Sequence, residues 1–358
     1  MHEPSQIREY YIAYLDILGY KNFFSEHEKE ILSFQAKIND AIQRSKEFIT
    51  KINGSPILKQ SLHFETRIFS DNILLCMDVS EDYLESARAI SFLQMVSDIQ
   101  REFITRYGLF LRGGIKRGYI SLNDDYIFGQ GLIDVVEIEE RKAIYPRIII
   151  DEALVDSIFT SKLFSEEELN IFAPIENAFN SNQEISEGDK EAYTNLIFRI
   201  KMSNMLQIIA LKLISKWDDG FYFVNYLQMI DSSSLLGPGT VESIKELLQS
   251  ISPSDYELVS QTSNDHDSYL MQNKKRIEEQ LQLYGCDKDV DFGNLDKAAG
   301  NAERREHVLK KYIWAMAYHN RFCRINNKTD FLIYTECNCD TRFLRTTITV
   351  QNYGEQEE

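Results

Sequence analysis

The sequence predicts an α+β protein in which helices cover one face of an antiparallel sheet, followed by a mostly helical C-terminal part. In the N-terminal part, short apolar runs with strand composition alternate with longer runs whose apolar residues recur at helical spacing. A turn cluster rich in Ser, Gly and Pro lies at residues 232–239, and two long helical patterns follow it. We therefore expect one domain over residues 8–230 and a second, mostly helical domain over residues 240–358.

The first expected strand covers residues 10–15, a run of aromatic and aliphatic side chains without a turn signal. Asp16 follows this run directly, and Gly19 comes three residues later. Taken alone, an aspartate at this point is typical of the cap of a following helix, which we expect over residues 26–52.

A hairpin is expected next, because two short apolar runs, at residues 68–69 and 73–77, flank Ser70-Asp71-Asn72. Asp71 taken alone is typical of a turn. Together with Asp16, it provides two carboxylates on neighbouring strands. Divalent cations such as Mg²⁺ take carboxylate oxygens, and a pair of them can stabilise the attacking and leaving oxygens of a phosphoryl transfer. The two aspartates therefore predict a two-metal site.

A second long helix is expected over residues 85–106, with Ile90, Leu93, Val96 and Ile99 as its buried stripe. A second hairpin should follow, with strands at residues 109–112 and 119–122. Three glycines between these strands, at positions 113, 114 and 118, would let a ligand approach the backbone. The next helix begins with Gly129-Gln130-Gly131, whose amide N–H groups could meet a phosphate.

Positive charge is concentrated between residues 112 and 147 of an otherwise acidic chain: Arg112, Lys116, Arg117, Arg141, Lys142 and Arg147. A guanidinium suits bidentate contacts with phosphate. Arg112 lies in the glycine-rich block, and Arg147 begins another expected strand after Tyr145-Pro146. We expect these two residues to be the phosphate-binding candidates.

Four sequence blocks, in their order along the chain, resemble the class III nucleotide cyclase family. They are Asp16 with Gly19-Tyr20, the hairpin with Asp71, Arg112-Gly113-Gly114 with Gly118, and Phe128-Gly129 before a helix. The resemblance covers about the first 150 residues and implies a ferredoxin-like antiparallel sheet. It also implies that Asp16 and Asp71 are catalytic and, with the main-chain carbonyl of Ile17, bind two divalent cations, Mg or Mn. In that family the 3′-hydroxyl of a nucleoside triphosphate attacks its own α-phosphate.

Several positions depart from the family pattern. Ser70 stands where the family usually has Gly, and the two base-reading positions are Arg67 and Tyr126 rather than the Lys and Asp of many adenylate cyclases. The helix that usually supplies Asn and Arg to the ribose and phosphates instead has Ile133, Asp134, Glu137 and Glu139. These departures argue against a purine reader, and the phosphate cation must come from elsewhere.

With the long C-terminal extension, the departures resemble the pyrimidine cyclases of the Pycsar antiphage system, which make cyclic CMP or cyclic UMP. A guanidinium at Arg67 could satisfy the adjacent O2 and N3 acceptors of cytosine, whereas uracil has a donor at N3. We therefore favour CTP over UTP. Two alternatives stay open: Arg67 pairs with an acidic residue, or Tyr126 packs in a dimer interface. The resemblance further implies a homodimer with shared sites and a separate effector protein that senses the product.

Composition excludes several function classes. A formal net charge of −17 argues against broad nucleic-acid binding, which needs a basic surface. Five cysteines make a disulfide framework improbable and favour a reducing compartment, and Cys337-Asn-Cys339 lacks a second ligand pair for zinc. The sequence has no signal peptide and no apolar span of about 18 residues. We expect a cytoplasmic protein that does not bind membranes.

Residues 158–200 are acidic and rich in Asn, Ser and Glu, and are expected to form a surface insertion. His319 lies in an apolar helical pattern beside aromatic residues and is expected to be a core residue. Two other function classes remain. One is a catalytically silent, cyclase-like nucleotide sensor. The other is a palm-type nucleotidyltransferase, which would need a basic channel for its polymer.

Overall fold

The structure, a computed structural model, describes residues 7–20, 36, 39–40, 43, 64–79, 85–123, 126–161, 164–181, 185–228, 264–286 and 302–334. The chain divides into two compact units, Met1–Asn273 and Lys274–Glu358. The domain boundary expected at residues 232–239 lies outside the described residues, as does most of the helix expected over residues 26–52.

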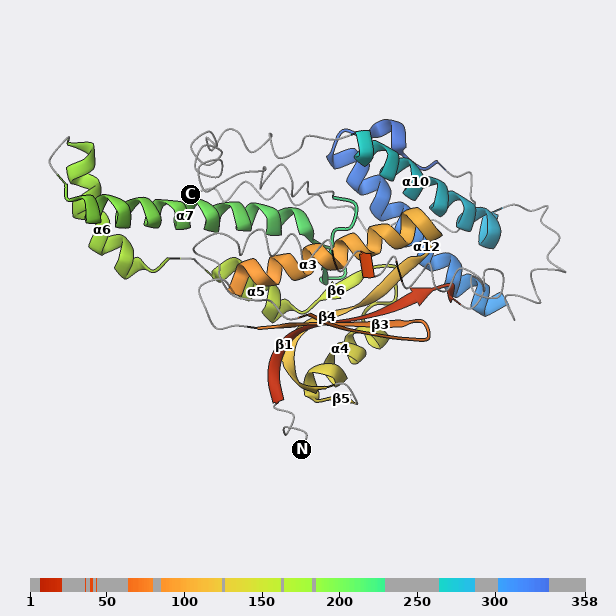
Figure 1. Cartoon of the computed structure of the whole chain (residues 1–358). Coiled ribbons are helices and arrows are strands. Elements are labelled where there is room, and N and C mark those ends of the chain that lie inside the picture. Colours follow the sequence, from red (N-terminus) through yellow and green to blue (C-terminus); the bar gives the residue numbers. More distant parts are fainter. Residues whose placement is uncertain are drawn as a thin grey trace. The chain divides into compact units, whose positions relative to one another are not determined.

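The first unit contains a mixed sheet with the order β2-β3-β1-β4-β6-β8-β7, and β5 pairs with β4 off this path (Figure 1). The strands are β1 (Ile7–Leu18), β2 (Phe64–Phe69), β3 (Asn72–Asp78), β4 (Phe110–Leu122), β5 (Ile127–Phe128), β6 (Ile148–Ile150), β7 (Ile214–Lys216) and β8 (Tyr222–Val224). Among the described strands all pairs are antiparallel except β4 with β6, which confirms the predicted α+β class.

The described helices of the first unit are α3 (Glu85–Glu102), α4 (Gln130–Arg141), α5 (Glu152–Thr160), α6 (Glu166–Asn180) and α7 (Glu187–Leu213). A π-helical turn, Phe103–Tyr107, extends α3. The acidic segment expected as an insertion is largely helical, because α6 and α7 occupy most of it. The C-terminal end of α7 joins the core through Leu206, Ile209, Ala210 and Leu213. No described helix is long and apolar enough to cross a membrane.

Helices cover both faces of this sheet, so the expectation of helices on one face is wrong (Figure 1). Tyr11, Ala13 and Leu15 of β1 face the core shared with α3, α5 and α7, whereas Tyr10 and Ile12 face Val135 of α4. Successive side chains of a strand point to opposite faces. Because every position from 10 to 15 is apolar or aromatic, both faces of β1 need cover.

β4 is one continuous strand and not the hairpin that the sequence suggested. It pairs with β1 along the whole length of β1, from Ile7 opposite Ser121 to Leu18 opposite Phe110. Its glycines permit close helix packing. A Cβ on Gly114 would lie 2.7 Å from Cγ2 of Ile138 in α4, and one on Gly118 would lie 2.8 Å from Cα of Gly131. These glycines therefore accommodate α4, and the expected role in ligand approach is not what the structure shows for them.

The second unit is helical where it is described, which agrees with the predicted C-terminal part. It contains α12 (Ala302–Ile325), a 3-10 turn (Thr329–Phe331) and the C-terminal half of α10 (Asn264–Leu281), which a π-helical turn, Gln282–Cys286, extends. The side-chain amide of Asn320 in α12 donates to the carbonyl oxygen of Ile333 at 2.9 Å and accepts from its N–H at 2.7 Å. His319 is fully buried, as predicted.

Candidate functional site

One predicted aspartate lies in a strand, and the other lies in the turn at the end of the neighbouring hairpin. Asp16 is inside β1, where it pairs with Asn72 of β3 on one side and Arg112 of β4 on the other. Asp71 occupies the tight turn between β2 and β3, and its carbonyl oxygen accepts a hydrogen bond of 2.8 Å from the backbone N–H of Ile17. The sheet register thus brings together the Asp16, Ile17 and Asp71 backbones that the sequence singled out.

Arg112 connects Asp16 to helix α4. Its Nε donates to Oδ2 of Asp16 at 2.6 Å, and its Nη2 forms an ion pair with Oε1 of Glu139 at 2.6 Å. Its Nη1 donates to the carbonyl oxygen of Ala143 at 3.4 Å. Glu139 is a buried carboxylate, with 4% of its surface exposed. The predicted phosphate-binding candidate Arg112 is therefore next to the aspartates and held between two carboxylates.

The environment of Tyr14 reports the charge of this region. Burial is the main cause that raises the pKa of the Tyr14 hydroxyl, and the carboxylates of Glu139, Asp16, Asp71 and Glu140 raise it further. Nearby negative charge raises a phenol pKa because it disfavours the phenolate. Four carboxylates therefore lie within electrostatic range of the Tyr14 hydroxyl.

Within the described part of the chain, no group of three or more His, Cys, Asp or Glu side chains could hold a metal ion by itself. The predicted ligand set is smaller, with two carboxylates from Asp16 and Asp71 and a main-chain carbonyl from Ile17. All three are hard oxygen donors, which suit Mg²⁺ or Mn²⁺, and these ions usually keep several waters and bind substrate phosphates as well. The donor chemistry and the surrounding negative charge fit a divalent cation.

Ser70 holds the turn that carries Asp71. Its φ angle is 56°, in the left-handed region that favours glycine. The side-chain amide of Asn72 donates to Oδ1 of Asp71 at 3.3 Å on the other side of the turn. The chain thus keeps a glycine-type turn with a serine, and Asp71 retains its place beside Ile17.

The two predicted base-reading residues meet at Asn123. Nη2 of Arg67 donates to the Asn123 carbonyl oxygen at 3.1 Å, and the backbone N–H of Tyr126 donates to Asn123 Oδ1 at 2.8 Å. Arg67 also pairs with Glu65 at 2.9 Å, which is the acidic pairing left open above. The Tyr126 ring is 44% exposed and lies 5.3 Å from the ring of Phe128.

Arg67 faces the same side of the sheet as Asp16. In register, Arg67 lies opposite Leu74 of β3, and Leu74 lies opposite Tyr14 of β1. Residues opposite each other across strands share a face, and residues two positions apart on a strand share it too. Arg67, Tyr14 and Asp16 therefore belong to one surface of the sheet.

Arg147, the other phosphate-binding candidate, is a structural cation. It is 1% exposed and forms a two-pronged ion pair with Asp219, with Nη1 3.1 Å from Oδ1. Its guanidinium also lies within 6.0 Å of the ring centroids of Tyr145, Phe221 and Phe223. A buried guanidinium paired in this way is costly to expose, because its carboxylate partner would be left without a cation. Arg147 is therefore less accessible to a ligand than Arg112, whose side chain is 23% exposed.

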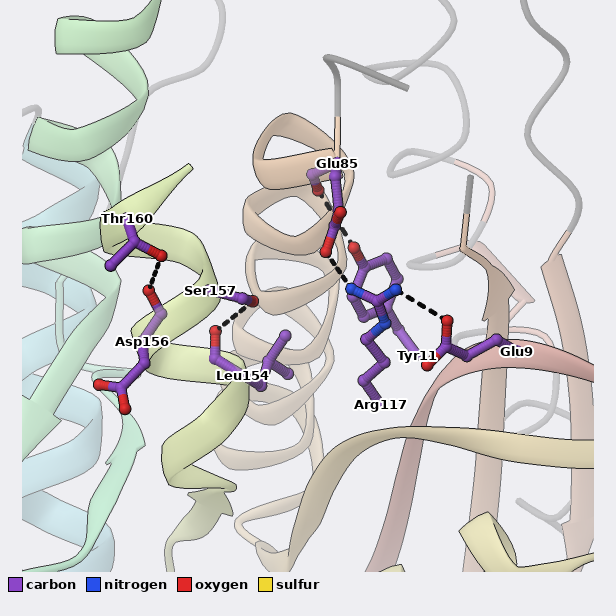
Figure 2. A network of polar contacts seen from close by, with 8 residues as sticks. All are labelled: Glu9, Tyr11, Glu85, Arg117, Leu154, Asp156, Ser157 and Thr160. Atoms are coloured by element: carbon purple, nitrogen blue, oxygen red, sulfur yellow. Dashed lines mark hydrogen bonds and ion pairs between the residues drawn. The ribbon is translucent and has the colours of Figure 1, made fainter. Parts of the chain in front are cut away.

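Three other basic residues of this segment are also paired with carboxylates, namely Lys116, Arg117 and Arg141, whereas Lys142 lies over the ring of Phe221. Figure 2 shows Arg117 between Glu9 of β1 and Glu85 at the start of α3, where the Tyr11 hydroxyl donates to the Glu85 carbonyl oxygen at 3.1 Å. Lys116 pairs with Asp134 at 3.0 Å. Because the chain carries more acidic than basic residues, its cations find carboxylate partners within the fold.

The glycines that begin α4 serve packing. Gly129 has a φ of 143°, and a Cβ there would lie 2.7 Å from the Tyr119 carbonyl oxygen. A Cβ on Gly131 would lie 2.7 Å from Cδ1 of Ile12. The backbone N–H of Ile133 bonds to the Gly129 carbonyl oxygen at 3.4 Å. These contacts explain both glycines without a phosphate.

Sequence reasoning noted Glu139 only as a departure from the family pattern on this helix; it missed Glu139 as a partner of Arg112, and it missed Asn123. A signal for Glu139 was present, because it lies four residues after Val135 and so falls on the apolar stripe of α4. A carboxylate on such a stripe needs a cationic partner inside the fold. Asn123 has no comparable signal, because its contacts depend on how the β4–β5 connection folds back.

No protein-family model matches the chain, and no curated protein matches it. Among solved structures, it is similar to the adenylyl cyclase CyaB from P. aeruginosa, with 13% identity over 44% of this chain and 83% of that one and a TM-score of 0.31. It is also similar to the guanylyl cyclase Cya2, with 14% identity over 44% of this chain and 81% of that one and a TM-score of 0.29. A third similar structure is a Class III adenylyl cyclase-like ATP-binding protein from Pseudomonas aeruginosa, with 12% identity over 47% of this chain and 37% of that one and a TM-score of 0.25. At these TM-scores the likeness does not assign an activity to the chain.

Proposed function

We propose that this protein is a nucleotide cyclase that converts CTP to 3′,5′-cyclic CMP and diphosphate. The observation that carries the proposal is the placement of Asp71 beside Ile17, next to Asp16 on the adjoining strand. Two carboxylates fixed by one sheet register meet the main demand of two-metal phosphoryl transfer.

In the proposed reaction, the 3′-oxygen of CTP attacks the α-phosphorus, the bond from this phosphorus to the oxygen that bridges to the β-phosphate breaks, diphosphate leaves, and the 3′-hydroxyl proton passes to water. Asp16, Asp71 and the carbonyl of Ile17 hold two divalent cations, Mg or Mn. When bound, these cations supply charge neutralisation for the attacking and leaving oxygens. The rigid backbone pairing of β1 with the Asp71 turn keeps both carboxylates oriented, and Arg112 is the nearby guanidinium for the phosphates.

Arg67 is the proposed reader of the base. Its guanidinium can donate to O2 and N3 of cytosine together, once substrate replaces its contacts with Glu65 and the Asn123 carbonyl oxygen. Tyr126 is anchored to the same Asn123 and offers an exposed ring for stacking. UTP is the alternative substrate, with cyclic UMP as product, if N3–H of uracil meets an acceptor such as the Glu65 carboxylate.

We further propose a homodimer in which Asp16 and Asp71 of one chain and Arg67 and Tyr126 of the other form each site. This arrangement follows from the family resemblance. It is supported by exposed apolar rings near the proposed site, Phe69, Tyr126 and Phe128, which a second chain could cover. By the same resemblance, the product would be a second messenger in antiphage defence, sensed by a separate effector protein.

A catalytically silent nucleotide sensor is the second candidate function. The observation that favours it is the contact between Arg112 and Asp16, because the guanidinium uses a carboxylate oxygen that a metal would need. Ser70 and Glu137 depart from the cyclase pattern in the same direction. A sensor of this kind would bind a nucleotide without turning it over.

The test is to incubate the full chain with Mn²⁺ and ATP, GTP, CTP or UTP in separate reactions and to identify products by mass spectrometry. The Asp71→Ala variant is the loss-of-site control, and Asp156→Ala removes an exposed carboxylate on α5 as the matched control. Cyclic CMP from wild type and from Asp156→Ala, but not from Asp71→Ala, is the expected result. Tight binding of CTP without any product would instead favour the sensor, and a cyclic purine would refute the proposed base.

A further inference from the structure

We propose that Glu139 is a positioning residue that sets how tightly a divalent cation binds at Asp16, by holding the Arg112 guanidinium from the opposite side. The inference rests on the proposed function, because it takes Asp16 as a metal ligand. It concerns a residue outside the proposed metal ligands and outside the proposed base-reading pair. It also explains why an arginine stands against a carboxylate that the reaction needs.

Arg112 competes directly with a cation for Asp16. Its Nε is 2.6 Å from Oδ2 of Asp16, a normal distance for a charge-assisted hydrogen bond. A metal ion that coordinates this oxygen must displace the guanidinium or share the carboxylate with it. Movement of the guanidinium away from Asp16 therefore favours binding of the metal ion, and a stronger contact between Arg112 and Asp16 disfavours it.

Glu139 pulls the same guanidinium away from Asp16. Its Oε1 lies 2.6 Å from Nη2 of Arg112, and its side chain is only 6% exposed, compared with 17% for Asp16. A buried carboxylate is strongly destabilised without a cation, so Arg112 cannot leave Glu139 cheaply. When Asp16 turns to a metal, the guanidinium keeps Glu139 and the Ala143 carbonyl oxygen as partners.

The effect depends on contact and not only on the negative charge of this region. Glu140 is the next residue and is also among the carboxylates that raise the pKa of the Tyr14 hydroxyl. Glu140 is exposed, and among the described residues it forms no ion pair with Arg112. A change at Glu140 therefore measures the general loss of one negative charge, and any excess at Glu139 measures its action through Arg112.

The experiment is a titration of the full chain with Mn²⁺, in which the free ion is followed by electron paramagnetic resonance in the absence of nucleotide. Four variants are compared with wild type: Glu139→Gln, Glu140→Gln, Arg112→Gln and the double variant Arg112→Gln with Glu139→Gln. Glutamine at position 112 can still donate a hydrogen bond to Glu139, which limits the cost of the lost cation. Circular dichroism checks that each variant is folded.

We expect Glu139→Gln to raise the Mn²⁺ dissociation constant roughly tenfold and Glu140→Gln to raise it about twofold, from the distance dependence of charge interactions. Arg112→Gln should lower the dissociation constant. When position 112 is Gln, Glu139→Gln should raise the dissociation constant only about twofold, as Glu140→Gln does. The reason is that residues in contact are coupled in a double-mutant cycle. If Arg112→Gln does not fold, Arg112→Lys replaces it, since one ammonium cannot hold two carboxylates as the guanidinium fork does.

Two outcomes would overturn the inference and leave the metal site standing. One is that Glu139→Gln and Glu140→Gln change the Mn²⁺ dissociation constant equally. The other is that Glu139→Gln has its full effect on this constant even when position 112 is Gln. Wild-type protein that does not bind Mn²⁺ would overturn the metal site of the proposed function and this inference with it. The readout is cation binding, so the two failures are separable without any measurement of turnover.

Discussion

The backbone N–H of Ile17 donates to the carbonyl oxygen of Asp71 at 2.8 Å, and this bond joins the end of β1 to the turn between β2 and β3. It is a main-chain contact, so it holds the Asp71 backbone whatever the side chains do. The turn that carries Asp71 is thereby held beside the strand that carries Asp16, one residue before Ile17. The geometry of the turn therefore decides how well the proposed metal ligands are arranged.

The first prediction concerns the residue before Asp71. Ser70 has a φ of 56°, where an L side chain is disfavoured and glycine is not. We expect Ser70→Gly to raise the free energy of unfolding by about 1 kcal/mol, after allowance for the greater entropy of glycine in the unfolded chain. Urea denaturation measures this. Asn327, with a φ of 55°, is the matched control. Because asparagine tolerates this conformation, Asn327→Gly should gain only a few tenths of a kcal/mol. A destabilised Ser70→Gly would show that the serine makes a contact that outweighs its backbone strain.

The second prediction concerns the packing of α4 on β4. A Cβ on Gly118 of β4 would lie 2.8 Å from Cα of Gly131 in α4. Because both atoms are fixed to backbone, the clash can be relieved only if α4 moves away from β4. We expect Gly118→Ala to lower the free energy of unfolding by roughly 1–3 kcal/mol, as overpacked cores do. Thermal unfolding measures the change. At Gly188, in the first turn of α7, a Cβ would meet nothing closer than Ser186 Oγ at 4.0 Å, so Gly188→Ala should be neutral or slightly stabilising. Equal stability of the two variants would mean that α4 shifts freely.

The third prediction concerns pH. Burial lowers the pKa of His319 to about 4 from a usual 6.5, so the folded second unit holds this imidazole neutral. The unfolded chain binds its proton below pH 6.5, and the stability from neutral His319 is lost as the pH falls from 6.5 towards 4. Between pH 7 and pH 4.5, wild type should lose about 2 kcal/mol more unfolding free energy than His319→Gln.

The check on His319 is urea denaturation of both proteins at each pH. Glutamine is chosen because its amide can still donate to the carbonyl oxygen of Phe331, which His319 contacts at 2.9 Å. Lys274 is the nearby cation that also lowers the His319 pKa. Parallel stability profiles for wild type and His319→Gln would contradict the prediction.

The fourth prediction tests the proposed shared site. An Asp71→Ala chain would lack metal ligands and an Arg67→Ala chain would lack base recognition, so each homodimer should be inactive. A mixed dimer keeps one site with both sets intact. Equal-ratio mixing should restore roughly a quarter of wild-type cyclic CMP synthesis, since half of the dimers would be mixed and each has one working site of two. Failure to restore activity, with subunit exchange confirmed by tagged chains, would exclude the shared site.

Local pattern was sufficient for much of this fold. The apolar stripe predicted for the second long helix is buried in α3, where Ile90, Leu93, Val96 and Ile99 are at most 3% exposed. The run at residues 10–15 and the turn at Ser70-Asp71-Asn72 correctly predicted β1 and the β2–β3 hairpin. Periodicity and turn chemistry act within a few residues, and a single sequence contains that information. The adjacency of the Asp16 and Asp71 backbones was expected from the family resemblance and not from the local pattern of either segment.

Partner choice over long distances was not accessible in this way. β4 looked like a hairpin because its glycines suggest a break, yet they are extended residues that let α4 approach. Arg112 and Arg147 look equivalent as cations in the sequence. One is held between Asp16 and Glu139, and the other is buried against Asp219. An arginine pairs with the carboxylate that folding brings within reach. Arg112 is 96 positions from Asp16 and Arg147 is 72 positions from Asp219, so each pair meets only when the sheet has formed. For this reason the chain alone predicts the chemistry of the site, whereas the assignment of each cation depends on how the strands and α4 assemble.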